Sequence, residues 1–82
     1  MFNYDSKLIQ ILKALGENWI IQDYQLAGMG WVAVISSDAV KFSLHSERGW
    51  VDIYFGKYQD QNKLGCKSKV EDIVHIIVKN VT

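Results

Sequence analysis

Two neighbouring segments in the middle of the chain alternate apolar and polar residues, and this alternation limits the possible folds more than any other feature. In 39–45 and again in 50–55, every second residue is aliphatic or phenylalanine. Successive side chains of a strand point to opposite faces, so each segment is predicted to be a strand with one buried and one solvated face. The predicted inward residues are Val40, Phe42, Leu44, Val51, Ile53 and Phe55.

Two further segments, 19–26 and 31–36, are also predicted to be strands. Residues 31–36 are apolar at almost every position, which is typical of a central strand that is buried on both faces. The connections between the four strands are short and contain Gly28, Asp38 or Gly49, which suit tight turns. Because strands joined by short turns pair with their neighbours in sequence, we expect an antiparallel meander.

One helix is predicted before these strands and one after them. In 5–15, leucine and isoleucine recur at helical spacing, and Asp5 or Ser6 would cap the first turn by accepting a hydrogen bond from a free backbone N–H. In 69–79, valine and isoleucine form a similar apolar stripe. This second helix would begin with the capping box Ser68–Glu71.

These elements predict a single domain over residues 1–82, of the α+β class, in the order α-ββββ-α. Residues 56–67 are polar and contain two glycines, so they are predicted to be a loop. Two helices with one apolar stripe each can both pack on one face of the four-stranded antiparallel meander, which gives a two-layer domain. The opposite face of the sheet would then stay open to solvent.

The charge and cysteine content narrow the kind of partner. Lys and Arg total 9 and Asp and Glu total 9, whereas a nucleic-acid-binding protein normally has a basic excess that neutralises phosphates. Nucleic acid is therefore not the expected partner. Cys66 is the single cysteine, whereas small secreted domains normally carry several disulfides. The first residues show no signal-peptide pattern and no apolar run reaches about 20 residues, so we expect a cytoplasmic protein without membrane association.

The sequence lacks the motifs of common enzymes and metal sites. It contains no G-x-G-x-x-G, Walker loop, H-E-x-x-H or G-x-S-x-G. His45, His75 and Cys66 fall on different predicted elements and lack the paired spacing of structural zinc ligands. We therefore expect a binding protein rather than an enzyme, with no cofactor, no metal and no catalytic residue.

The solvated face of the last two predicted strands carries the candidate binding site. Trp50 and Tyr54 point to that face from one strand, and polar or charged residues of the neighbouring strand share it. Large aromatic side chains beside charged groups are typical of interface hot spots. An alternative interpretation is that these aromatic side chains pack under the 56–67 loop. The predicted partner-binding residues are Lys41, His45, Trp50, Asp52, Tyr54 and Tyr58.

The segment from Val40 to Gly56, VKFSLHSERGWVDIYFG, resembles the strand, Ser-Glu-Arg-Gly, strand pattern of small bacterial immunity proteins. These proteins are encoded beside polymorphic or contact-dependent growth-inhibition toxins. The predicted elements on either side agree with that layout, so the resemblance covers most of the chain. It implies a protein that binds a cognate toxin domain in the cytoplasm and covers its active site. Immunity proteins against basic nucleases are often acidic, whereas this chain has no net charge.

Two other functions stay open at the level of sequence. One is an inhibitor or regulator from a phage or mobile element that binds a larger protein or nucleoprotein machine. The other is a small nucleic-acid-binding module in which Trp50 and Tyr54 stack on bases. A toxin gene beside this gene would favour the immunity function, and a phage operon would favour the inhibitor or regulator. Salt-dependent binding of oligonucleotides would identify the nucleic-acid-binding module.

Overall fold

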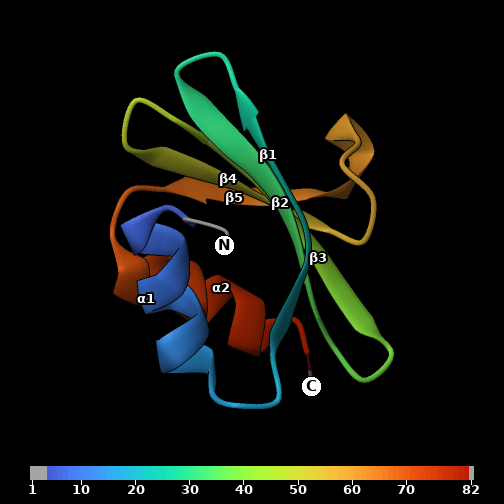
Figure 1. The fold of residues 1–82 in the computed structure, drawn as a ribbon. Coiled ribbons are helices and arrows are strands. Elements are labelled where there is room, and N and C mark those ends of the chain that lie inside the picture. Colours follow the sequence, from blue (N-terminus) through green and yellow to red (C-terminus); the bar gives the residue numbers. More distant parts are fainter. Residues whose placement is uncertain (1–3, 82) are drawn as a thin grey trace.

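A computed structural model describes residues 4–81 as two α-helices and a five-stranded sheet (Figure 1). Neighbouring strands are antiparallel and follow the order β1-β2-β3-β4-β5, which confirms the α+β class and the antiparallel meander. In residues 4–81, no helix is long and apolar enough to cross a membrane. The elements are α1 (Ser6–Leu15), β1 (Ile20–Ala27), β2 (Gly30–Ser37), β3 (Val40–Glu47), β4 (Trp50–Phe55), the 3-10 helix η1 (Asp60–Asn62), β5 (Lys63–Lys67) and α2 (Val70–Lys79).

The fifth strand corrects the prediction of a four-stranded sheet. The sequence predicts a loop over 56–67, whereas β5 pairs with β4 and places Gly65 opposite Ile53. The pattern misses β5 because the strand is short, ends in lysine on both sides and contains glycine, which is depleted in strands. What stabilises β5 is the edge of β4, whose backbone N–H and C=O groups need partners.

The core lies between the sheet and the two helices, which Figure 1 shows on the same side of the sheet. Burial of one aliphatic or aromatic side chain in this core contributes about 1.5–3 kcal/mol to the free energy of unfolding. Phe55, at the end of β4, is 45% exposed, although its ring still contacts Phe42 with the centroids 5.3 Å apart. The fully packed residues are Leu8, Ile11, Trp31, Ala33, Ile35, Phe42, Leu44, Val51, Ile53, Ile73 and Ile77.

The first helix has a cap at each end, and Lys7 in its first turn bonds to two distant segments of the chain. The side chain of Asp5 accepts a hydrogen bond from the backbone N–H of Lys7 at 2.8 Å, as expected of an N-cap. The helix ends at Leu15, and the next residue, Gly16, is the C-cap, with a φ of 113° and its backbone N–H donating to the carbonyl of Leu12. The ammonium group of Lys7 donates to the carbonyls of Gly49 at 2.7 Å and Ser68 at 2.8 Å. These two bonds tie α1 to the β3–β4 turn and to the residues just before α2.

The second helix begins without the predicted capping box. Lys69 is its N-cap, with no hydrogen bond from its side chain. The carbonyl of Lys69 accepts from the backbone N–H groups of Asp72 and Ile73, so the first helical turn starts one residue after Ser68. Glu71 still lies in the first turn, where a carboxylate interacts favourably with the helix dipole.

A β-bulge in β1 changes the face of its first residue. Ile21 and Asp23 pair with successive residues of β2, so Gln22 is an extra residue. The alternation of the sequence predicts Ile20 on the same face as Tyr24, but the extra residue shifts the alternation. Ile21 packs against the core instead, and Ile20 is 57% exposed.

Candidate functional site

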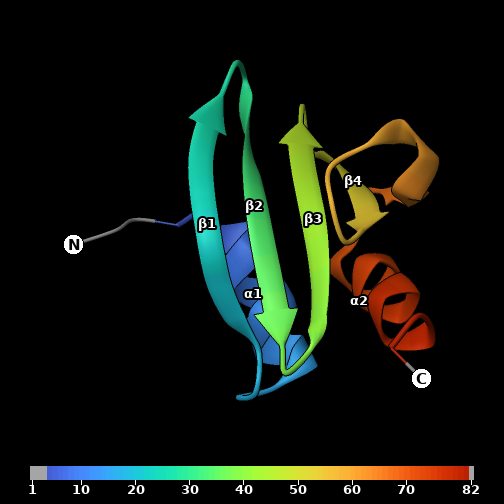
Figure 2. The same ribbon diagram turned by 90° about the vertical axis from the view of Figure 1, so that its right-hand side faces the viewer.

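We call the face of the sheet that points away from both helices the outer face. Figure 2 views the molecule from this side, with β1, β2 and β3 in front of α1 and with the segment after β4 passing in front of β4. Residues that pair across antiparallel strands point to the same face. Two rows therefore cross the outer face, Val32, His45, Asp52 and Cys66 in one, and Val34, Ser43, Tyr54 and Lys63 in the other.

The segment that follows β4 covers part of the outer face. The hydroxyl of Ser43 donates to the carbonyl of Gly56 at 2.6 Å, which fixes the start of the segment. The ring of Tyr58 then packs on that of Tyr54, with the centroids 4.7 Å apart. Tyr54 is only 4% exposed, so the prediction that it lies on the solvated surface is wrong. The alternation within β4 gave its face correctly, and for Tyr54 the alternative interpretation, packing under the 56–67 segment, is the one that the structure shows.

Asp52 is the centre of a group of polar and aromatic side chains on the outer face. Nδ1 of His45 lies 3.2 Å from Oδ2 of Asp52, and Nζ of Lys63 lies 3.3 Å from Oδ1. The thiol of Cys66 also hydrogen-bonds to this carboxylate. His45 stacks on Tyr58 with the centroids 5.5 Å apart and the rings inclined by 27°. We call this group the Asp52 cluster, formed by His45, Asp52, Tyr54, Tyr58, Lys63 and Cys66.

Burial and hydrogen bonding shift the pKa values within the cluster. For Asp52, burial acts to raise the pKa, but hydrogen bonds from Cys66, His45 and Lys63 together outweigh it and hold the pKa below the ordinary value of 3.8. Burial, and then the charge of Asp52, raise the pKa of Tyr54 from 10.0 to about 12. Burial and the hydrogen bond to Asp52 also raise the pKa of Cys66 above 9.0. Near neutral pH the cluster therefore contains an ionised carboxylate beside a neutral phenol and a neutral thiol.

A hollow of about 500 Å³ lies beside the Asp52 cluster, and we call it the outer-face hollow. Val32 and Val34 of β2 line it, together with Asp23 of β1, Lys41 of β3 and Tyr58. Ligand pockets typically have volumes of about 300–1,000 Å³ with mostly apolar walls and a few polar groups. The aliphatic side chains of β2 in this hollow therefore have an acidic residue, Asp23, on the strand to one side and a basic residue, Lys41, on the strand to the other.

The structure brings most of the predicted binding residues together. Lys41 and Tyr58 line the outer-face hollow, and Tyr58 stacks on His45, which contacts Asp52. Trp50 lies on the same face at the far end of β4 and is 54% exposed. It belongs to the same surface but not to the cluster.

Sequence reasoning missed two kinds of residue on this surface. It assigned Val32 and Val34 to a strand buried on both faces, although two helices on one face leave every second residue of β2 on the other. The sequence pattern therefore contained enough information to place Val32 and Val34 on the outer face. Lys63 and Cys66 were missed because β5 was predicted to be part of a loop, and the pattern of 56–67 gives no sign of their pairing with β4.

The Asp52 cluster contains one thiol, that of Cys66, whose pKa is raised. His45 and Cys66 both contact the carboxylate of Asp52. A raised thiol pKa lowers the thiolate fraction that a nucleophile needs. Among residues 4–81, no group of three His, Cys, Asp or Glu side chains is arranged to hold a metal ion.

Comparison with protein families, with curated proteins and with solved structures finds no match.

Proposed function

We propose that this chain is an immunity-type protein that neutralises a cognate toxin domain by binding it on the outer face and covering its active site. The observation that carries this proposal is the outer-face hollow, where the half-buried side chains of Val32 and Val34 line the wall together with Lys41 and Tyr58. An apolar centre with a polar rim is the usual composition of a protein interface. The Ser-Glu-Arg-Gly pattern within 40–56 supports the immunity class specifically.

Tyr58 is suited to anchor such a partner. Its side chain is 48% exposed, yet Tyr54 packs against one part of the ring and His45 stacks on it. The bond from His45 to Asp52 in turn fixes the imidazole. A side chain that is already ordered loses less entropy on association, so more of its contact energy contributes to affinity.

Charge at the rim of the hollow supports recognition of an acidic partner surface. Lys41 lines the hollow from β3 and Lys57 from the segment after β4, and Asp23 is the one carboxylate among the lining residues. Exposed charges at a rim mainly raise the association rate and reject partners of like charge. A toxin domain with carboxylates around its active site would be attracted to this rim.

The structure weakens the case for a nucleic-acid-binding module. That function needs Trp50 and Tyr54 as two exposed platforms for bases. Tyr54 is 4% exposed and lies under Tyr58, so it has no free ring face for a base.

The test is the survival of cells that express the toxin domain encoded beside this gene. Co-expression of the chain should restore growth. Val34→Asp should abolish protection, because it places a carboxylate in the apolar part of the interface. Lys41→Glu should weaken protection by reversing a rim charge. Lys69→Glu makes the same charge change at the start of α2, away from the outer face, and should protect as well as the parent.

Each variant is first checked by circular dichroism and thermal unfolding, so that loss of protection is not loss of fold. Titration calorimetry with the purified toxin domain then gives the affinities. Full protection by a folded Val34→Asp variant would contradict binding through the outer face. Failure of the parent to bind the toxin domain, or location of the gene in a phage operon without a toxin, would contradict the immunity assignment.

A further inference from the structure

β1 forms one edge of the sheet and pairs on one side only. The strand order places it first, next to β2, and no other strand within residues 4–81 pairs with it (Figure 2). Along such an edge, alternate residues direct backbone N–H and C=O groups outward, where another strand can bond to them. β1 is 8 residues long and contains neither proline nor lysine, two residues that protect an edge, although the bulge at Gln22 interrupts its row of outward backbone groups. Its single charged residue is Asp23.

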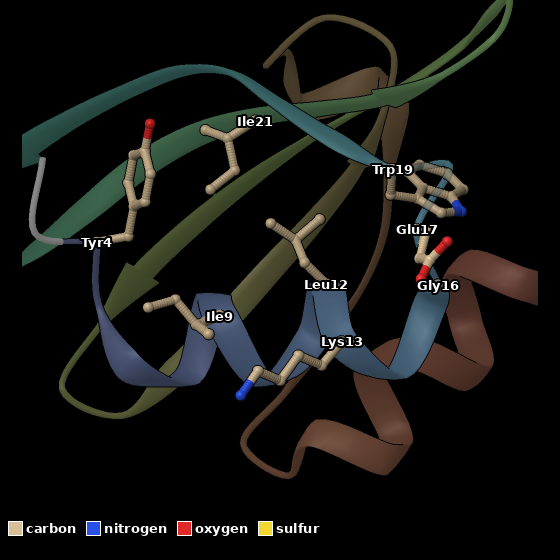
Figure 3. A pocket seen from close by; sticks show the side chains of 8 residues that line it. All are labelled: Tyr4, Ile9, Leu12, Lys13, Gly16, Glu17, Trp19 and Ile21. Carbon is tan, nitrogen blue, oxygen red and sulfur yellow. The ribbon is translucent and has the colours of Figure 1, made fainter.

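A groove of about 440 Å³ lies between this edge and α1 (Figure 3). Ile9 and Leu12 point into it from α1, and Ile21 points into it from β1. Tyr4 and Trp19 line its two ends. We call it the α1–β1 groove. Its apolar side chains are those that a further strand beside β1 would cover.

The depression continues along the strand rather than ending at Ile21. A second hollow of about 260 Å³ is lined by Ile21, Gln22 and Asp23, at the β-bulge, and by Tyr4 and Tyr24. Tyr4 and Ile21 line both hollows, so the two adjoin along β1. The two hollows together form an elongated depression, whose shape fits an extended peptide better than a compact small molecule.

We propose that the α1–β1 groove receives an extended segment of another protein, which adds to β1 as a further strand of the sheet. The backbone of the segment bonds to the outward N–H and C=O groups of β1, and its apolar side chains, at every second position, enter the groove. The intervening side chains lie on the outer face, where a lysine or arginine meets Asp23. This surface shares Asp23 with the outer-face hollow but no other lining residue, and the inference does not depend on the proposed function.

Charge favours another protein over a second copy of this chain. Antiparallel pairing of two β1 strands around their centres brings the two Asp23 carboxylates close together. Like charges across neighbouring strands are destabilising, whereas opposite charges stabilise the pair. The occupant is therefore a segment with alternating apolar residues and a basic residue between them.

The probe is a capped peptide as long as β1, 8 residues, with the sequence Thr-Val-Thr-Val-Lys-Val-Thr-Val. Amide shifts of the isotope-labelled full chain report where it binds, and fluorescence anisotropy reports the affinity. The expected shifts fall on β1 and on the groove residues of α1. No toxin domain is present in this assay, so its result is independent of the survival test of the outer face.

Two pairs of variants test the residues that carry the inference. Ile9→Lys places a charge in the groove and should abolish peptide binding, whereas Val78→Lys makes the same change on α2 and should leave it unchanged. Both parent side chains are partly exposed, at 38% for Ile9 and 51% for Val78, so both variants should fold. Asp23→Lys should lower the affinity for the peptide roughly fivefold. A peptide with glutamate in place of lysine should restore the affinity of this variant.

Four results would overturn the inference. They are absence of binding, shifts centred on the outer-face hollow, equal affinity for Ile9→Lys and the parent, and failure of the glutamate peptide to rescue Asp23→Lys. A concentration-dependent dimer that Ile9→Lys dissociates would assign the groove to a second copy. Peptide binding that occurs only after removal of residues 1–3 would assign it to this chain's own amino-terminal segment.

Discussion

His45 and Asp52 pair across β3 and β4, and their side chains meet on the outer face with Nδ1 3.2 Å from Oδ2. The same carboxylate bonds to Lys63 and Cys66 of β5. One acidic side chain therefore joins three adjacent strands on the face that neither helix covers.

Asp52→Asn should lower stability at neutral pH and reduce the acid dependence of folding. The folded pKa of Asp52 lies below its ordinary value of 3.8, so the unfolded chain binds this proton first as the pH falls. The stabilisation is fully present above 3.8 and is lost as the pH falls through the folded pKa. Urea unfolding as a function of pH should show a difference between parent and variant that narrows below 3.8. A difference that stays constant into strong acid would contradict the hydrogen-bonded carboxylate.

Tyr54 should ionise late in the folded protein. Burial raises its pKa from 10.0 to about 12, so the stability that comes from its neutral form is present below 10.0 and is lost as the pH rises toward 12. Ultraviolet absorbance of the phenolate, followed while circular dichroism shows the chain still folded, should contain a late phase that Tyr54→Phe removes. Ionisation of every tyrosine of the folded chain near 10.0 would contradict the packing of Tyr58 over Tyr54.

Gly30→Ala should destabilise the protein more than Gly49→Ala. A Cβ on Gly30 would overlap the carbonyl of Ser46, so β2 and β3 must separate to admit it, at a cost of about 3 kcal/mol. Gly49 has open space around it but a φ of 85°, next to Arg48 at 53°, as in a type I′ turn. Alanine there should cost only the strain of positive φ, about 1 kcal/mol. Urea unfolding of both variants tests the order, and the reverse order would contradict the close approach of Gly30 to β3.

Trp50→Ala should change stability little, in contrast to Trp31→Ala. Trp50 is 54% exposed and Trp31 only 3% exposed. Truncating the buried ring should cost about 3–5 kcal/mol in thermal or urea unfolding, and truncating the exposed one no more than about 0.5 kcal/mol. If Trp50 also contacts the partner, its loss should weaken binding by about 2 kcal/mol. A Trp50→Ala variant that unfolds would instead place this ring in the core.

Local periodicity predicts the elements whose faces are decided within a few residues. The alternation of 40–44 and 51–55 gives the inward face of both strands, where Phe42 and Ile53 are 0% exposed, although Phe55 at the end of β4 is 45% exposed and not buried as predicted. The cap at Asp5 and the positive φ of Gly49 are also local and are confirmed. In each case the residue type itself sets the backbone or the buried face.

Features that depend on distant partners were not predictable in the same way. β5 forms because β4 offers an unpaired edge, and Tyr54 is buried because Tyr58 folds back over it. Neither is encoded in a period of two residues. The outward position of Val34 was within reach, because it follows from placing both helices on one face.

The bonds of Lys7 have a consequence for the order in which the protein matures on the ribosome. α1 is synthesised first, yet Lys7 bonds to carbonyls at Gly49 and Ser68, and Leu8 packs in the same core as Ile77. A nascent chain that stops before α2 already contains both carbonyls but lacks Ile73 and Ile77, so its first helix packs on an incomplete core. The helix wall of the α1–β1 groove therefore gains its last core contacts only once α2 has emerged, and only then does a strand partner meet a fully packed α1.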